Sequence, residues 1–444
     1  MAVPTYSEDL TDIDMGQSTT DWNAYGGGGA GLGTGADFAI QSTLAVDKQI
    51  TNADKGMMHS DAGVSLGPND HIIGWIFAAT PGILDTLANG GKVMAIGTST
   101  SDFNKYALEG SDTRPEGGNK PYAVRYSTAT PSPGSQVGTP GATPSFFGGG
   151  LNTVATAKGA NLGLDAFRYG SGAFITAGEI ANPATFAGFA TQDEAALNKW
   201  GLLFRSNGVY QWQGRFVVGQ NNAGTPTLAY FDDASGAVIT ILDTLHSQTD
   251  FTQLIIDHAS TVFNLSGATF ISLGTNNPGI IVINNASATS TGFDTCTFRR
   301  MGTIQGHVNV PYTSCSFILT DQITQNSGDF TSCVFDRVTA TAALLSNDPS
   351  KLDSNSFISD GTGHAIEITT PGTYAFSGNK FTGYSGTGTN AAVYNNSGGL
   401  VTLNISGGGD TPTVRNGAGA STSVVNAVVL TITSKDAANS AAIE

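Results

Sequence analysis

The sequence predicts an all-β protein in which a β-sandwich-like region precedes a parallel β-solenoid. Three observations predict this fold class: a six-residue phrase that recurs in the second half of the chain, a composition rich in turn formers, and a shortage of helical patterns. The 444 residues include 58 glycines, and only 12% are charged. Glycine supplies positive φ at corners, while the abundant serine, threonine and asparagine suit turns, so the composition indicates turn-dense β structure.

The recurring phrase has a large apolar residue at its first and sixth positions and alanine, cysteine or asparagine at its fourth. Successive copies follow at steps of 18 to 28 residues, which is about the length of one solenoid coil. One such coil cannot bury its own apolar face, but coils stacked about 4.8 Å apart cover one another. The copies are LSGATF, FDTCTF, YTSCSF, FTSCVF, LDSNSF and FSGNKF, which begin at residues 265, 293, 312, 330, 352 and 376.

Alternation within the phrase predicts two interior ladders that run along the stack. A period of two places the fourth and sixth residues on one face, and the small residues at positions two and three indicate a corner. Asparagine at the fourth position can bond to its copy above and below. The predicted ladder residues are Ala268, Cys296, Cys315, Cys333, Asn355 and Asn379 at the fourth position and Phe270, Phe298, Phe317, Phe335, Phe357 and Phe381 at the sixth.

The three cysteines all occupy the fourth position of a phrase. Their odd number argues against a complete disulfide framework, and parallel side chains on neighbouring rungs have poor disulfide geometry. We therefore expect reduced, buried thiols that act as small apolar side chains, with no metal or redox role.

Four segments are predicted in chain order. The first segment begins with acidic and polar residues and contains a glycine run, which indicates a flexible arm. The last contains the β-forming run SVVNAVVLTIT, which could cover the open end of a solenoid. The segments are 1–50, an N-terminal arm and glycine-rich linker; 51–227, a β-sandwich-like anchoring region; 228–410, a parallel β-helix; and 411–444, a C-terminal capping strand.

Within the sandwich-like region, apolar runs at 71–77, 92–96 and 122–126 are separated by turn residues, as in jelly-roll or lectin-like folds. Residues 128–150 are rich in proline, serine and glycine and are expected to form an extended loop. The best helical pattern is short, at residues 192–199.

The charge and the hydropathy pattern exclude several classes of function. A net charge of −16 repels nucleic-acid backbones and anionic membranes. The first residues have neither the basic segment nor the apolar core of a secretory signal, and no run of 18 apolar residues would span a membrane. Scattered histidines and laddered cysteines predict no metal cluster, so we expect no cofactor.

Glycosidase chemistry would need carboxylates from neighbouring rungs to meet at one glycosidic bond. Asp294 and Asp353 share the second position of the phrase, but two rungs without aspartate separate them. At about 4.8 Å per rung they lie roughly 14 Å apart, which is too far for such a pair. The other acidic candidates are expected at corners, where aspartate forms turns; they are Asp329, Asp336, Asp360 and Glu367. No catalytic residue is therefore expected.

One histidine and three arginines are further candidates for a functional site. His364, in the segment DGTGHAIEI, invites comparison with the glycine-histidine motif of β-helical pectin hydrolases, but the Asn-Thr-Asp segment of that family is missing. We expect it to be a rung residue at a corner. Arg299, Arg300 and Arg337 could bind an acidic sugar, although solvated surface charge is the favoured interpretation.

Tryptophan residues could serve as sugar-stacking platforms. In a sandwich such side chains more often belong to the core, which is the interpretation favoured for Trp75, Trp200 and Trp212.

Residues 359–369, 374–384 and 390–409 resemble β-helical virion structural proteins of tailed bacteriophages, and the likeness covers roughly residues 160–440. The resemblance implies a right-handed parallel β-helix, commonly trimeric, attached to the virion surface as a fibre, spike or decoration. The family has no catalytic motif that maps onto positions of this chain.

These lines of reasoning predict a non-enzymatic structural protein on the exterior of a phage virion, made in the host cytoplasm and contributing to host-surface attachment. The expected partners are the protein itself as a homotrimer, other virion proteins and a host surface glycan, with no nucleic acid or membrane. A trimer is favoured because three solenoids side by side bury their flat faces without a cofactor. The alternative is a tailspike-type protein that binds or degrades polysaccharide.

Overall fold

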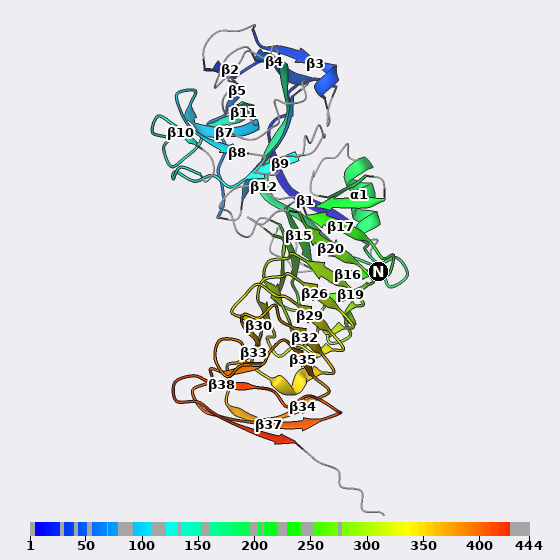
Figure 1. Cartoon of the computed structure of the whole chain (residues 1–444). Helices are drawn as coiled ribbons and strands as arrows, with labels where there is room; N and C mark the ends of the chain where they lie inside the picture. The colour runs from blue at the N-terminus through cyan, green and yellow to red at the C-terminus, as the bar shows by residue number, and fades with distance from the viewer. Residues whose placement is uncertain are drawn as a thin grey trace, which may run out of the picture.

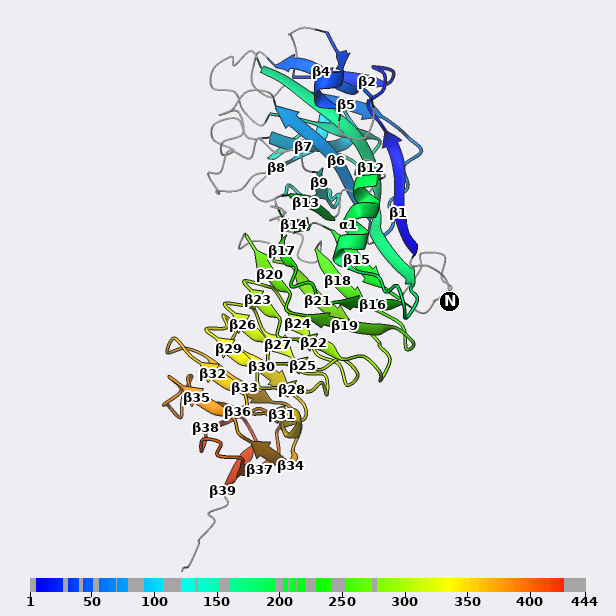
Figure 2. The ribbon, with the colours of Figure 1, turned by 90° about the vertical axis from the view of Figure 1, so that its right-hand side faces the viewer.

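The molecule is elongated and built almost entirely of strands, with a sandwich at one end and a long stack of short strands at the other (Figures 1 and 2). In the described residues, one α-helix, α1 (Phe186–Ala195), lies where the two parts meet. The computed structural model describes residues 5–26, 31–39, 43–50, 56–68, 70–78, 92–107, 121–131, 135–151, 160–195, 203–206, 208–212, 214–219, 229–241, 252–273 and 278–426.

The N-terminal part is a sandwich of two sheets that share one apolar core. Val46, Ile76 and Leu164 from one sheet pack with Met94 and Phe147 from the other. One sheet is antiparallel, in the order β10 (Ser135–Val137), β8 (Asp102–Ala107), β7 (Lys92–Ser99), β11 (Phe146–Leu151), β5 (Gly56–Ser60) and β2 (Trp22–Tyr25). The facing sheet contains β3 (Gly33–Gly35), β4 (Ala45–Ile50), β6 (His71–Ala78), β9 (Pro121–Val124) and the first half of β12 (Ala160–Ala177).

Strand β12 connects the sandwich to the stack as one continuous strand of 18 residues. Its first half pairs antiparallel with β4 and β6. Its second half pairs antiparallel with β1 (Thr5–Asp14) on one side and parallel with β15 (Arg215–Val218) on the other. The pairing of β12 with β6 contains a bulge between Asp165 and Arg168 and then continues to Gly170. The two parts of the molecule therefore share a backbone element.

From β14 onward the chain runs through three parallel sheets in turn, which we call sheets I, II and III (Figure 2). Sheet I continues from β12 and β15 through β18 (Gln253–Ile256), β21 (Ile280–Ile283), β24 (Ile304–Gln305), β27 (Ile323–Thr324), β30 (Ala342–Ser346), β33 (His364–Ile368), β36 (Val393–Asn395) and β38 (Val414–Asn416). Sheet II contains β13 (Leu203–Ser206), β14 (Val209–Trp212), β17 (Val238–Ile241), β20 (Thr269–Ser272), β23 (Thr297–Arg299), β26 (Ser316–Ile318), β29 (Val334–Asp336), β32 (Ser356–Ile358) and β35 (Lys380–Thr382).

Sheet III forms the remaining side of the stack. It contains β16 (Tyr230–Asp233), β19 (Val262–Ser266), β22 (Gly292–Asp294), β25 (Tyr312–Thr313), β28 (Phe330–Thr331) and β31 (Leu352–Asp353). Beyond it lies a three-stranded parallel sheet of β34 (Gly372–Ser377), β37 (Leu400–Ser406) and β39 (Ser421–Asn426). Long parallel sheets in an all-β chain are compatible with the expected solenoid. Parallel pairing starts at Ala173 and reaches Asn426, so it extends past the interval 228–410 at both ends.

Other segments also differ from the sequence-based expectations. The described residues among 1–50 do not form a separate arm, because β1 to β4 are strands of the sheets. Residues 27–30 of the glycine run lie outside the described residues. Helix α1 begins at Phe186, earlier than the expected 192–199. The predicted cap contributes β39, which pairs parallel with β37 as a further rung, while residues 427–444 lie outside the described part.

Residues 128–150 were expected to be an extended loop, but they include β10 and most of β11. The glycines of β11 explain the error, because they look like loop residues in the sequence. A Cβ at Gly148 would collide with the carbonyl oxygen of Met57, and one at Gly149 would lie 2.7 Å from Ile76. Glycine is needed here because β11 lies between β5 and β7 in a crowded sheet.

Helix α1 covers the end of the stack core that faces the sandwich. Phe186, Phe189 and Ala190 are buried at a helical spacing of three and four residues. The Phe189 ring lies 4.6 Å from that of Phe216 in β15, and the Phe186 ring lies 5.1 Å from that of Phe231 in β16. The helix thus shields the first rungs from water.

The sixth position of the phrase forms a continuous aromatic ladder on sheet II. Adjacent rings from Phe270 to Phe381 are nearly parallel, with centroids 5.4, 5.1, 4.9, 4.6 and 5.5 Å apart along the ladder. The register pairs each phenylalanine directly with the next. Phe381, at the last of these rungs, is only partly buried.

The third position of the phrase is a corner in the left-handed region. Its φ lies between 52° and 70° in all six copies, at Gly267, Thr295, Ser314, Ser332, Ser354 and Gly378. This sharp turn sends the chain from sheet III into sheet II. The first-position carbonyl lies beside this turn, where it can accept a further bond from a side-chain donor.

Side chains at the fourth position supply that donor. Each reaches back to the first-position carbonyl of the preceding phrase: Cys315 to Phe293 at 3.3 Å, and Asn379 to Leu352 at 2.7 Å. Cys296, Cys333 and Asn355 make the equivalent bonds. The Asn355 amide also donates to Asn379 Oδ1 at 3.1 Å. All three thiols are free and buried, and they act as weak donors as well as small apolar groups.

We predict that stability falls at alkaline pH. Burial raises the pKa of the Cys315 thiol and of the Tyr312 hydroxyl above their ordinary values of 9.0 and 10.0. The unfolded chain therefore loses protons above about pH 9 that the folded chain keeps, and the free energy of unfolding decreases as the pH rises. Each group contributes up to about 1.4 kcal/mol per pH unit. Urea unfolding between about pH 8 and pH 11 measures this slope.

The variants Tyr312→Phe and Cys315→Ala remove one titrating group each. Both are expected to be less stable at pH 8 and to lose less stability on going to pH 11 than the unmodified protein. An unchanged slope in the double variant would contradict the role of these buried groups.

Candidate functional site

The carboxylates considered for glycosidase chemistry are spread along the stack. Asp294, Thr313, Thr331 and Asp353 occupy one ladder of sheet III, so two threonine rungs separate the aspartates as the sequence indicates. At about 4.8 Å per rung the separation is roughly 14 Å. Such a distance exceeds the spacing of glycosidase carboxylate pairs.

The remaining acidic candidates have local partners. Asp329 accepts from Lys351 Nζ at 2.9 Å, and Asp336 accepts from Arg337 Nε at 2.9 Å. The Asp360 carboxylate accepts from Thr362 within a turn. Glu367 accepts from the Asn396 amide at 2.8 Å. Each carboxylate is thus engaged in stabilising a corner or a rung.

His364 belongs to a buried cluster near the far end of the stack. Its Nδ1 lies 2.9 Å from the Ala391 carbonyl oxygen, which can only accept, so Nδ1 carries the proton. Nε2 then accepts from Arg415 Nη1 at 3.2 Å. The Arg415 guanidinium lies 4.7 Å from the centre of the Tyr394 ring, which also stacks on His364. Both ring nitrogens of His364 are used, which fits a structural role.

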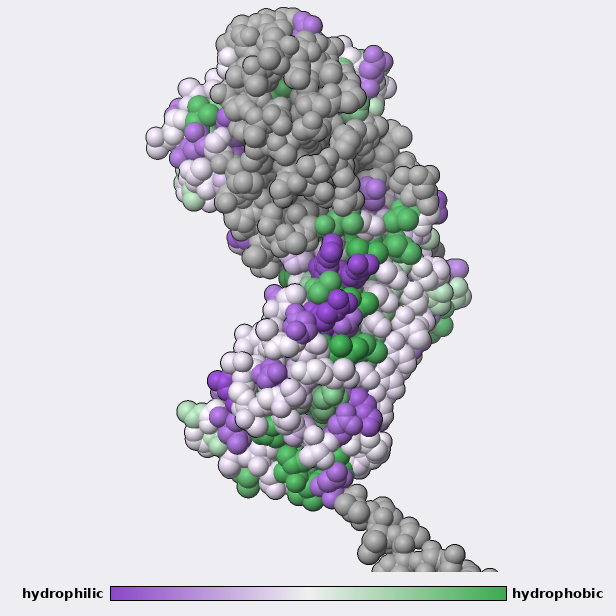
Figure 3. Space-filling model, in the orientation of Figure 1, coloured by the Kyte–Doolittle hydropathy of each residue, from purple (hydrophilic) through white to green (hydrophobic). Residues whose placement is uncertain are grey.

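Isoleucine and charged side chains alternate on the outer surface of sheet II. The register places Ile271, Arg299, Ile318, Asp336 and Ile358 on successive rungs. Figure 3 shows hydrophobic and hydrophilic atoms side by side over the upper and middle rungs. Arg299 and the following Arg300 are exposed and have no ion-pair partner among the residues that the structure describes.

Two of the tryptophan candidates are core residues. Trp75 and Trp212 are buried, with 3% and 2% of their surface exposed. Trp200 lies outside the described residues. Neither buried ring is available to a sugar.

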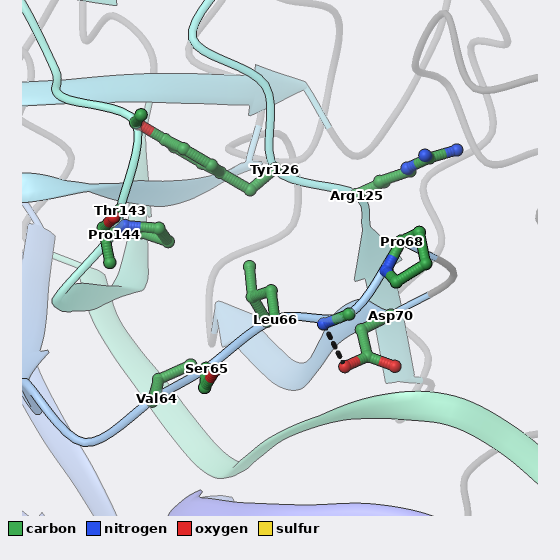
Figure 4. A pocket seen from close by; sticks show the side chains of 11 residues that line it. Val64, Ser65, Leu66, Pro68, Asp70, Arg125, Tyr126, Thr143 and Pro144 are labelled. Carbon is green, nitrogen blue, oxygen red and sulfur yellow. Dashed lines mark hydrogen bonds between the residues drawn. The ribbon is translucent and has the colours of Figure 1, made fainter.

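A pocket of about 360 Å³ opens at the edge of the sandwich (Figure 4). Three segments far apart in the sequence line it: residues 64–68 with 70, residues 125–126, and residues 142–144. In Figure 4 the Tyr126 ring and Leu66 face each other across the hollow. Thr143 and Pro144 lie at one end, and Arg125, Pro68 and Asp70 lie at the other.

Hydrogen bonds fix the two long walls of the pocket. The Gly67 backbone N–H donates to Asp70 Oδ2 at 2.7 Å, and the Asp70 N–H donates to the Gly67 carbonyl at 3.2 Å. This is a turn of the kind that glycine, proline and aspartate favour. The Tyr126 hydroxyl donates to the Gly141 carbonyl, and burial raises the pKa of that hydroxyl. The pocket is therefore formed without a ligand.

The lining combines an aromatic ring, two hydroxyl groups from Ser65 and Thr143, a carboxylate and a guanidinium. Such a set can bind a small polar molecule with an apolar face. The described residues contain no group of three histidine, cysteine, aspartate or glutamate side chains that could hold a metal ion. Nor does any described helix have the length and apolar character that crossing a membrane requires.

Sequence reasoning missed this pocket and the partners of His364. The pocket segments are brought together only by the strand order of the sandwich, which local patterns do not reveal. Tyr394 and Arg415 could have been found, because they follow His364 by about one and two coils and share the ladder of Glu367.

The chain matches no protein-family model and no curated protein sequence. Parts of the chain can be matched to solved structures, three of which are the following. The CBM22-1 xylan-binding domain from Paenibacillus barcinonensis Xyn10C is 14% identical over 38% of this chain and 96% of that chain, with a TM-score of 0.22. The family 11 carbohydrate-binding module from Clostridium thermocellum is 13% identical over 38% and 96%, with a TM-score of 0.24.

The Agl-KA catalytic domain is 13% identical over 94% of this chain and 97% of that chain, with a TM-score of 0.20. Scores and identities this low carry no argument about the activity of this protein.

We predict that Arg415 braces the far end of the stack. Arg415→Met would leave the buried Nε2 of His364 without a donor and should lower the free energy of unfolding by about 1–3 kcal/mol. Arg300→Met is the matched control at an exposed site and should change it by less than about 0.5 kcal/mol. Urea unfolding of both variants measures the difference. Equally small changes in the free energy of unfolding would contradict a stabilising role of Arg415.

Proposed function

We propose that this protein is a non-enzymatic structural component on the exterior of a bacteriophage virion, with a right-handed parallel β-helix as its projecting rod. The observation that carries the proposal is the parallel pairing of sheet I, which continues from strand to strand between β12 and β38. The sequence resemblance to β-helical virion proteins supports the same assignment. The dispersed carboxylates favour a structural role over polysaccharide cleavage.

The geometry suits a protein that bears mechanical load. Hydrogen bonds between rungs run along the long axis of the stack, since parallel strands bond sideways to their neighbours. A pull along the axis therefore acts on all three sheets together. Because β12 continues from the stack into the sandwich, the same load reaches the sandwich through backbone, which suits it as the anchoring end.

Self-association as a homotrimer is the second part of the proposal. The half-exposed isoleucines of the sheet II row, Ile271, Ile318 and Ile358, would lose contact with water against a second copy. A closed ring of three copies would cover this row in every subunit. Polysaccharide binding is kept as a second candidate function, because the sandwich contains the formed pocket of Figure 4.

Antibody labelling of intact virions tests the location. Phage particles recovered from host cultures that produce this protein should bind gold-labelled antibodies on their exterior in electron micrographs. Particles from which the gene is deleted are the control. Label that appears only after the particles are disrupted, or only on host cells, would overturn the proposal.

Sedimentation of the purified protein tests the trimer. The expected mass is three times the chain mass of 45.5 kDa. Ile318→Asp places a charge in the sheet II row and should shift the protein towards monomer. Thr331→Asp, on the polar sheet III, is the matched control and should leave the trimer intact. A monomer at micromolar concentration in the unmodified protein would contradict this part.

A further inference from the structure

We propose that the sandwich pocket binds a neutral sugar residue, such as one unit of a glycan chain. The proposal rests on the size of the pocket, its charges, its apolar walls and its preformed shape. A volume of about 360 Å³ lies at the small end of the range for ligand sites, roughly 300–1,000 Å³. This size suits a monosaccharide unit.

The charges at the rim favour a neutral ligand. Asp70 and Arg125 lie at the same end of the pocket in Figure 4. An isolated anion would meet the Asp70 carboxylate, and an isolated cation would meet the Arg125 guanidinium. A sugar hydroxyl can donate to a carboxylate and accept from a guanidinium.

Although most of the exposed lining is polar, its apolar part favours a ligand with a hydrophobic face. The Tyr126 ring and Leu66 face each other across the hollow, and the buried residues Val64 and Pro144 also line it. The C–H face of a pyranose ring can pack against an aromatic ring while its hydroxyls reach Ser65 and Thr143. Inorganic ions would leave these walls unused, whereas a lipid chain would leave the polar groups unpaired.

The pocket is also held open before any ligand arrives. The bond from Tyr126 to Gly141 fixes the ring, and the paired bonds between Gly67 and Asp70 fix the opposite wall. Behind the third segment, Ser145 donates to Gly97 in β7 at 2.8 Å. Little side-chain order is lost on binding, which favours affinity for a small ligand.

Ligand-observed NMR on the full-length protein tests the proposal. The probes are the methyl glycosides of glucose, galactose, mannose and N-acetylglucosamine, followed by neutral oligosaccharides of the sugars that bind. Sodium phosphate and sodium acetate serve as anionic probes. At least one neutral glycoside should bind, and neither anion should compete with it.

Two variants locate the binding. Tyr126→Ala removes the stacking ring and should weaken binding about tenfold, equivalent to about 1.4 kcal/mol. Asp70→Asn keeps an oxygen for the Gly67 N–H but removes the carboxylate, and it should weaken binding several-fold even if Tyr126→Ala fails to fold. Tyr230→Ala, at a half-exposed tyrosine of β16 outside the pocket, is the matched control and should bind as before.

Three results would overturn the proposal: no neutral glycoside binds, the anions bind in their place, or both pocket variants bind as well as the control. The outcome is separate from the virion assignment, because antibody labelling of particles does not depend on sugar binding.

Discussion

Strand β12 is the constraint on which the rest of the molecule depends. One run of 18 residues pairs with the sandwich on its first half and starts the parallel stack on its second half. A flexible linker would let the two parts move independently, whereas a shared strand fixes their relative direction. The pairing of β12 with β6 continues on both sides of the bulge between Asp165 and Arg168, so β12 stays in one sheet from the sandwich into the stack. Position and orientation of the pocket relative to the rod follow from this strand.

The stack could be predicted from the sequence because the pattern that specifies each coil lies within a few consecutive residues. Phenylalanine and cysteine in a phrase such as YTSCSF lie two residues apart from one another, and period-two alternation places both inside. The ladder spacing of Asp294 and Asp353 also follows from counting rungs. Backbone corners at the third position were visible as a cluster of small residues.

A sandwich-like region was predicted from the sequence, but the strands that build it and its pocket could not be predicted in the same way. The β1 sequence, TYSEDLTDID, lacks an apolar alternation, and it forms a strand because β12 offers it an edge far away in the sequence. The β11 glycines look like loop residues but serve close sheet packing. Likewise, Leu66, Tyr126 and Thr143 meet only after the sheets have formed. Long-range pairing, rather than local pattern, decides these features.

The fourth-position bonds of the phrase give the stack a direction. Each thiol or amide donor bonds to a carbonyl group of the coil before it, and the Asn355 amide also donates to Asn379 of the coil after it. A coil is thus complete only when its successor has been made. During synthesis from the N-terminus, every newly emerging coil brings the donor that the previous coil lacks, so assembly can proceed one coil at a time. A chain cut short inside the rod would leave the backbone groups of its last coil unpaired on every sheet, and with them the corner carbonyl that the next coil would have bonded, whatever the number of coils already in place.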